Sequence, residues 1–255
     1  MSHLKSFAAL SLFLLLALSG CKNNDLVSPN DTLSEKQLAK IVQDANNFST
    51  FLYEGNKLSK YESISDSKIF SSIQLDYNGN KRPQTEHYTS LNEEYLKKYF
   101  YDSNDKLEKT EYMFKDSLNT YSLKSYMKYL YDELNRLVTT EQYNVQNQII
   151  FYTEYYYDNS DNVTEKRFND TSGLVELTTM EYDNKINPWY NLREWLNYDV
   201  AISKNNLIKS TQTGQDSFET TIIYTYDSYG YPLTRTMETI MNNIKTIVES
   251  TYEYK

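Results

Sequence analysis

The chain is poor in the residues on which most catalytic and metal sites depend. Its 255 residues include one cysteine, Cys21, and two histidines, His3 and His87. A single cysteine excludes a disulfide framework within the chain. This composition also argues against Cys-His chemistry and histidine-rich metal sites. One conceivable Ser-His-Asp arrangement would use His87, but the alternating stretch TEHYTS favours an ordinary sheet histidine.

Long hydrophobic runs are also scarce, and the chain has one near its start. Lys5 precedes the apolar run from Phe7 to Leu18, which is too short to span a bilayer and suits a signal peptide. The run ends in LSGC, with the cysteine at Cys21. These residues resemble the lipobox at which bacterial lipoprotein precursors are cut and acylated. An ordinary signal peptide ending near a free thiol is the alternative.

The lipobox resemblance implies a division of the chain into three parts. We predict a lipoprotein signal peptide over residues 1–20, a lipidated Cys21 with a flexible tether over 21–34, and a single domain over 35–255. The resemblance implies a lipid anchor in the cell envelope of a Gram-negative bacterium, at the outer membrane on its periplasmic or surface face. Acyl chains at Cys21 would hold the domain to the membrane without a transmembrane segment.

The charge balance limits the partners. The full chain has 26 basic and 35 acidic residues. Removing the signal peptide takes Lys5 and no acid, which leaves 25 against 35 and a net charge of −10. Such a chain is unsuited to nucleic acid and to electrostatic adhesion on anionic lipid. The predicted partners are the membrane, through Cys21, and a glycan or an envelope protein. No cofactor is predicted.

Tyrosine, by contrast, is abundant: the chain has 26, and many lie in one recurring phrase. The phrase reads aromatic, any residue, aromatic, aspartate, and five residues later an aliphatic residue or proline. Its copies include YLYDELNRL, YYYDNSDNV and YTYDSYGYPL. Five aspartates mark the copies and are expected to cap turns by accepting the backbone N–H groups of the next two residues. They are Asp102, Asp132, Asp158, Asp183 and Asp227.

The third residue after each aspartate predicts a hairpin turn. Asp105, Asn135, Asp161 and Gly230 stand at this place, and Gly79 follows Asp76 in a weaker copy. These residue types tolerate the left-handed backbone that short hairpin turns require. In the copy that begins at Asp183, Ile186 departs from the pattern, and Asn187 is the candidate one place later.

The segments on either side of the turns predict strands. They are rich in β-formers and alternate, so both tyrosines of Tyr-x-Tyr should point to one face. The spacing predicts an all-β fold: an antiparallel meander of about 14–16 strands from Leu38 to Tyr254, curled into a water-soluble barrel or half-barrel. Leu38 to Ala45 also fits an amphipathic helix, but the repeat favours a first strand there.

The repeat resembles the tyrosine-aspartate (YD) repeat of Rhs and teneurin proteins. Together with the lipobox and the Asn187-Pro188 insertion, it resembles bacterial lipoproteins that carry a domain of unknown function with a porin-like fold. The resemblance spans residues 35 to 255 and implies a barrel with no assigned activity. Charged residues such as Lys98, Lys128 and Glu154 fall within the predicted strands, so the strands are not expected to face lipid.

Residues 189–203 depart from the repeat and are expected to form a loop with a short helix that covers an end or edge of the sheet. Aromatic side chains gather here and could form a ligand-binding patch at a barrel mouth or a plug of the core. They are Trp189, Tyr190, Trp195 and Tyr198.

The sequence identifies no reactive site. It predicts a cell-envelope lipoprotein with a non-catalytic binding or structural role. The alternative is a carboxylate-dependent glycan-active enzyme, which would need two carboxylates about 5 to 9.5 Å apart in a concave site. A third possibility is a carrier of a small apolar ligand, which would need a lumen lined with apolar residues.

Overall fold

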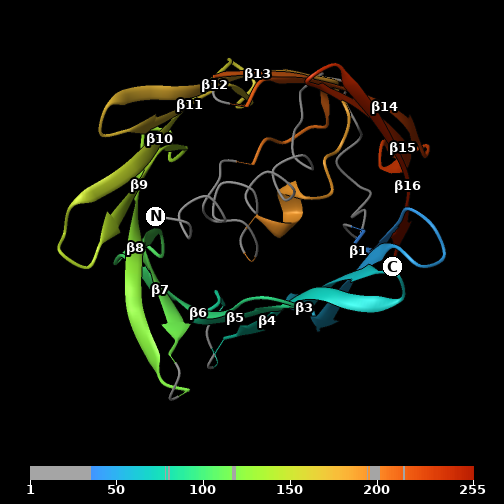
Figure 1. Ribbon diagram of the computed structural model, residues 1–255. Helices are drawn as coiled ribbons and strands as arrows, with labels where there is room; N and C mark the ends of the chain where they lie inside the picture. Colours follow the sequence, from blue (N-terminus) through green and yellow to red (C-terminus); the bar gives the residue numbers. More distant parts are fainter. Residues whose placement is uncertain are drawn as a thin grey trace.

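The fold is a closed antiparallel barrel of 16 strands (Figure 1). The computed structural model describes residues 36–77, 79, 81–116, 119–193, 195, 202–214 and 216–255. The predicted signal peptide, the tether with Cys21, and Tyr198 lie outside these residues. The first strand begins at Leu38 and the last ends at Tyr254, which confirms the predicted all-β meander and shows that the sheet closes.

Each strand pairs with its neighbours in sequence, and β1 also pairs with β16. The strands are β1 (Leu38–Val42), β2 (Phe48–Glu54), β3 (Lys57–Ser65), β4 (Lys68–Asp76), β5 (Thr85–Ser90), β6 (Glu94–Tyr101), β7 (Leu107–Lys115), β8 (Tyr121–Tyr131), β9 (Leu137–Asn144), β10 (Ile149–Tyr157), β11 (Val163–Asp170), β12 (Gly173–Tyr182), β13 (Leu207–Gly214), β14 (Phe218–Tyr226), β15 (Pro232–Met241) and β16 (Ile244–Tyr254).

Strand β1 closes the barrel. Its residues pair with β16 in the register Leu38 to Tyr254 and Ile41 to Tyr252, and with β2 on its other side. The segment from Leu38 is therefore a strand, as the repeat favours, and the helical spacing of its apolar residues is not used. Closure leaves no unpaired sheet edge among the described strands.

The repeated aspartates all lie at one end of the barrel, which we call the Asp rim. Because successive strands run in opposite directions, every turn of the phrase falls at this end. The predicted left-handed positions are confirmed, with positive φ at Asp105, Asn135, Asp161, Gly230 and Gly79.

The strands alternate between an inward and an outward face. Both tyrosines of Tyr-x-Tyr face inward, as predicted: Tyr129 is 4% exposed and Tyr131 packs against the same apolar cluster. Leu130 between them is 46% exposed and faces outward. The aliphatic residue that follows each turn is also inward, and Leu58 is fully buried. The inner wall near the Asp rim is therefore a belt of aromatic and aliphatic side chains.

The segment between β12 and β13 enters the barrel at the Asp rim. In Figure 1 its short 3-10 helix η2 (Tyr190–Leu192), in orange, lies inside the ring of strands. Trp189 packs edge-on against Phe51 of β2, with ring centroids 5.4 Å apart. A short helix is present as expected. It covers an end of the barrel and not an edge, because the closed sheet has none.

This insertion replaces the tight turn expected after Asp183. Neither Ile186 nor Asn187 has a positive φ, so the expectation that Asn187 takes the left-handed place is wrong. The physical reason is that Asn206, across the insertion, closes the turn instead. The backbone N–H of Asp183 donates to the Asn206 carbonyl at 3.1 Å, and the Asn206 N–H donates to the Asp183 carboxylate at 3.2 Å.

Helix contributes little to the described part of the chain. None of its helices is long and apolar enough to cross a membrane.

Candidate functional site

The aspartates of the Asp rim bind the turns that they precede. The Asp102 carboxylate accepts the backbone N–H groups of Asn104 at 2.8 Å and Lys106 at 2.9 Å. The hydrogen bond from Lys106 is the main cause that holds the pKa of Asp102 below its usual value. The donors are the second and fourth residues and not the next two, and the N–H of the third residue, Asp105, donates to the Asp102 carbonyl.

The same geometry repeats around the rim at the other predicted aspartates. Asp132 accepts from the second and fourth residues after it, and so do Asp158 and Asp227. Asp183 accepts from Lys185 and from Asn206. The structure therefore gives each carboxylate several backbone partners, which is the bonding of a turn cap.

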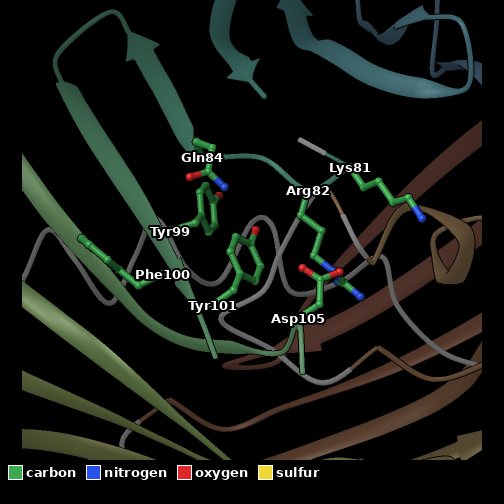
Figure 2. A pocket seen from close by; sticks show the side chains of 7 residues that line it. All are labelled: Lys81, Arg82, Gln84, Tyr99, Phe100, Tyr101 and Asp105. Atoms are coloured by element: carbon green, nitrogen blue, oxygen red, sulfur yellow. The ribbon is translucent and has the colours of Figure 1, made fainter. Parts of the chain in front are cut away.

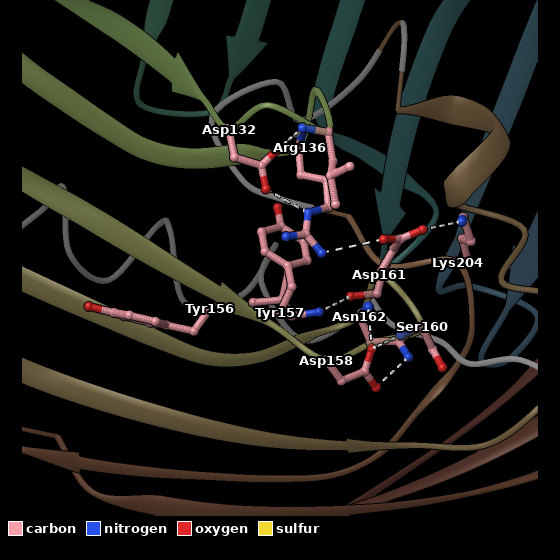
Figure 3. Close-up of polar contacts among 12 residues, drawn as sticks. Asp132, Arg136, Tyr156, Tyr157, Asp158, Ser160, Asp161, Asn162 and Lys204 are labelled. Carbon is pink, nitrogen blue, oxygen red and sulfur yellow. Dashed lines mark hydrogen bonds and ion pairs between the residues drawn. The ribbon is translucent and has the colours of Figure 1, made fainter.

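At one stretch of the rim, ion pairs link two turns and the insertion (Figure 3). Arg136 pairs with Asp132 at 2.7 Å and reaches Asp161 of the next turn at 3.4 Å. Lys204 of the insertion pairs with Asp161 at 2.7 Å, and this bond is the main cause that lowers the pKa of Asp161. These contacts tie the insertion to the barrel wall.

Tyrosines at the ends of strands, or just after them, join neighbouring hairpins at the rim. The hydroxyl donates to a backbone carbonyl at or near the start of the preceding strand, and we call this contact a tyrosine clasp. Seven clasps are present among the described residues: Tyr53 to Leu38, Tyr77 to Leu58, Tyr101 to Pro83, Tyr131 to Leu107, Tyr157 to Leu137, Tyr182 to Val163 and Tyr254 to Pro232. Tyr226 donates to the Asp183 carboxylate instead.

Burial raises the pKa of five clasp hydroxyls, those of Tyr53, Tyr77, Tyr131, Tyr157 and Tyr254, and that of Tyr131 rises to about 12. These tyrosines therefore stay neutral at physiological pH and remain hydrogen-bond donors. The sequence shows the repeated tyrosine but not its bond, because the acceptor is a main-chain carbonyl on another strand.

Replacing Tyr157 with phenylalanine tests the clasp. The Tyr157 hydroxyl donates to the Leu137 carbonyl at 2.6 Å. Its loss is expected to lower the free energy of unfolding by about 1 kcal/mol, measured by urea denaturation. The matched control is Tyr156→Phe, one residue away, because Tyr156 faces outward and is 40% exposed. Equal losses in both variants would contradict the clasp.

A pocket of about 500 Å³ lies beside the end of β6 at the Asp rim (Figure 2). Residues from the connection between β4 and β5 line it together with the end of β6 and the following turn: Lys81, Arg82, Gln84, Tyr99, Phe100, Tyr101 and Asp105. Arg82 pairs with Asp105 at 2.9 Å and lies over the Tyr101 ring at 6.0 Å. This pair ties the connection to the next turn.

Deeper in the barrel, two buried charged residues face each other across β5 and β6. Glu86 and Lys97 are cross-strand partners, 4% and 3% exposed. Glu86 accepts hydrogen bonds from Tyr99 and, at 3.4 Å, from Tyr95. The Lys97 ammonium lies 5.2 Å from the centroids of the Tyr99 and Tyr112 rings. The wall is therefore polar as well as aromatic. Sequence analysis missed Glu86, although the alternation in TEHYTS places it on the face of Tyr88.

The predicted aromatic patch is only partly brought together. Trp189 is 7% exposed and belongs to the core cluster with Phe51 and Leu192, so it forms part of the plug that the sequence left as an alternative. Trp195 is half-buried against the same cluster. Tyr190 is half-buried and lies under the Arg193 guanidinium at 3.8 Å. Tyr198 lies outside the described residues.

His87 lies on the outward face of β5 and contacts the Tyr121 ring edge-on, with centroids 6.0 Å apart. Within the described ranges, no group of three or more histidine, cysteine or acidic side chains is placed to hold a metal ion.

Comparison with known proteins supports the fold. No family model matches the chain, and no curated protein matches it. The chain is similar to the crystal structure of a porin-like protein from Bacteroides uniformis, with 12% identity and a TM-score of 0.55, over 86% of this chain and 98% of that one. At this identity the likeness shows the fold, which is porin-like.

Parts of much larger assemblies also align with the chain. The crystal structure of TcdB2-TccC3-TEV aligns with 15% identity and a TM-score of 0.30, over 80% of this chain and 10% of that one. The Photorhabdus luminescens Tc holotoxin pore aligns with 12% identity and a TM-score of 0.25, over 82% of this chain and 12% of that one.

Proposed function

We propose that this protein is a non-catalytic binding barrel of the bacterial cell envelope, held to a membrane by lipid on Cys21. The observation that carries the proposal is the charge on the outward face. Cross-strand partners there include Lys98 with Glu111, Lys128 with Glu141, and Glu154 with Arg167.

These rows of charge lie between the strand ends, where a membrane-spanning barrel would present apolar residues to lipid. A lysine or arginine at mid-bilayer depth on the lipid face costs about 2 to 4 kcal/mol. The outward face is therefore suited to water. A link to the membrane would then come from outside the barrel, and Cys21 is the residue suited to it.

The inner wall supports a binding role. It combines aromatic faces with inward polar groups such as Glu86 and Lys97. A carrier of purely apolar ligands would need a lumen lined with apolar residues, and these polar groups do not suit one. At the Asp rim the carboxylates are engaged with turn N–H groups, which supports a structural use of these acids over a catalytic one.

Replacing Cys21 with serine tests the anchor. The variant is expected to move from the membrane or detergent phase into the aqueous phase, because the acyl chains supply the membrane affinity. Mass spectrometry should find an acylated N-terminal Cys21 in the wild-type protein. The matched control is Ser19→Ala, which keeps the cysteine and a small residue beside it. A wild-type protein without acylation, or a Cys21→Ser variant that stays with the membrane, would contradict the proposal.

A further inference from the structure

The connection between β4 and β5 is longer than the hairpin turns elsewhere on the Asp rim. It covers residues 77–84, which are eight residues, whereas the turn over residues 102–106 has five. The connection forms one side of the pocket of about 500 Å³, and the end of β6 with the following turn forms the other (Figure 2). This volume falls in the range of about 300 to 1,000 Å³ that small-molecule sites occupy.

Hydrogen bonds hold both sides of this pocket in place. The backbone N–H of Gln84 donates to the Asp76 carbonyl at 2.7 Å, and the Gln84 carbonyl accepts from the Tyr99 N–H at 3.0 Å. Pro83 is fully buried, and its carbonyl accepts a hydrogen bond from the Tyr101 hydroxyl at 2.8 Å. The pocket is therefore formed before a ligand arrives, and binding does not have to order these segments.

Two polar side chains that line the pocket are available to a ligand. The side-chain amide of Gln84 is half-buried and makes no hydrogen bond within the described ranges. The ammonium of Lys81 is exposed and has neither an ion pair nor a hydrogen bond in the same part of the chain. The amide offers donors and an acceptor, and the ammonium offers three donors. A ligand can bond to both groups without breaking a contact within the protein.

An ion pair sets the charge of the pocket. Figure 2 shows Arg82 and Asp105 on one side of the pocket and Gln84 with Tyr99 on the other. The Asp105 side chain is 65% exposed, so its carboxylate stays accessible to a ligand hydroxyl while it accepts from Arg82. Lys81 and Arg82 carry two positive charges and Asp105 carries one negative charge, which gives the lining a net charge of +1. This balance favours a ligand with one negative charge over a neutral one.

We propose that this pocket binds an acidic sugar, with the carboxylate of a uronic acid at Lys81 and sugar hydroxyls at Gln84 and Asp105. Amide and carboxylate groups donate to and accept from hydroxyls. The half-buried ring of Tyr101 adds an aromatic surface for the apolar face of a sugar. A phosphate dianion would carry more charge than the lining balances. The proposal rests on the binding role proposed above and names its site and ligand class.

The test measures binding of galacturonate to the purified protein by calorimetry. Galactose, which lacks the carboxylate, and acetate, which lacks the sugar, are the comparison probes. The wild-type protein should bind galacturonate at least about tenfold more tightly than either probe. Lys81→Gln should weaken galacturonate binding about tenfold, because it removes a charge-assisted hydrogen bond. Gln84→Ala should weaken it about threefold or more, because it removes neutral hydrogen bonds.

Lys185→Gln is the matched control for Lys81→Gln. Lys185 is an exposed lysine of the same rim, and it lies outside the lining of the pocket. This variant makes the same change of charge and should bind galacturonate like the wild type. Without ligand, all three variants should unfold at the wild-type temperature, because none of the three side chains makes a polar contact within the described ranges. Any loss of binding then reports on the pocket and not on folding.

The proposal is overturned if galacturonate does not bind the wild-type protein at about 10 mM, or if galactose or acetate binds equally well. It is also overturned if Lys81→Gln and Gln84→Ala both bind galacturonate as tightly as the wild type. Failure here is distinguishable from failure of the proposed anchor. Acylation of Cys21 is measured separately by mass spectrometry, and it stands or falls without the acidic sugar.

Discussion

Replacing Gly214 with alanine is expected to lower the free energy of unfolding by about 3 kcal/mol or more. Gly214 ends β13 with φ near +127°, a backbone conformation that residues with a side chain rarely adopt. A Cβ at this place would overlap the Val175 carbonyl oxygen and lie 3.0 Å from the Glu176 Cα. Both neighbours are main chain of β12, so they cannot move aside without breaking the pairing of Gly214 with Glu176.

The control for this variant is Gly55→Ala. Gly55 also has a positive φ, +62°, but nothing lies within 4 Å of a Cβ built there. Its substitution should cost about 1 to 2 kcal/mol, the price of the left-handed backbone alone. Urea denaturation of the two variants separates conformational strain from steric overlap. A Gly214→Ala variant no less stable than Gly55→Ala would contradict the close approach of β12 and β13.

Replacing Phe51 with alanine should destabilise the protein by about 3 to 5 kcal/mol, because it empties a site at the centre of the core. Phe51 is 2% exposed and contacts both Tyr61 of β3 and Trp189 of the insertion. The matched control is the next residue. Leu52 faces outward and is 49% exposed, so Leu52→Ala should change stability by about 0.5 kcal/mol or less.

Tryptophan fluorescence gives Phe51→Ala a local readout. Both tryptophans of the chain, Trp189 and Trp195, lie in the insertion. Loss of the Phe51 ring should expose Trp189 to water and shift its emission to longer wavelength at denaturant concentrations where the barrel is still folded. Unchanged emission in the folded variant would show that the insertion does not pack on β2.

The architecture could be predicted from the sequence because it repeats. The phrase places a left-handed residue three positions after four of its five aspartates, and the structure has positive φ at Asp105, Asn135, Asp161 and Gly230. Alternation around the turns fixes which side chains share a face. The sequence pattern does not show whether the sheet closes into a barrel. Whether β1 meets β16 depends on twist and stagger accumulated over all the strands, and local pattern does not record these.

The insertion is where local reasoning failed. Asp183 opens the same phrase as the other turns, but its fourth-residue partner is replaced by Asn206, 23 residues later. A contact between residues so far apart leaves no periodic signal. The aromatic residues of this segment suggested either a binding patch or a plug of the core, and the packing of Trp189 on Phe51 places this residue in the core.

The inward position of Arg235 was hidden for a different reason. Arg235 lies in an ordinary strand phrase, LTRTME, and an arginine there is normally an outward residue. Its neighbours Tyr224 and Ser250 come from two other strands. The side of the sheet that it faces becomes visible only when the strands are assembled.

The most direct test of the account is a cross-link that requires the barrel to be closed. Val42 of β1 and Thr251 of β16 are cross-strand partners. Such antiparallel partners lie close enough for a disulfide. In a Cys21→Ser background, Val42→Cys with Thr251→Cys should form a disulfide under mild oxidation, detected as a linked peptide by mass spectrometry. Val42→Cys with Ile240→Cys, on β15, should not. Absence of the first link, or equal yield of the second, would contradict closure through β1 and β16.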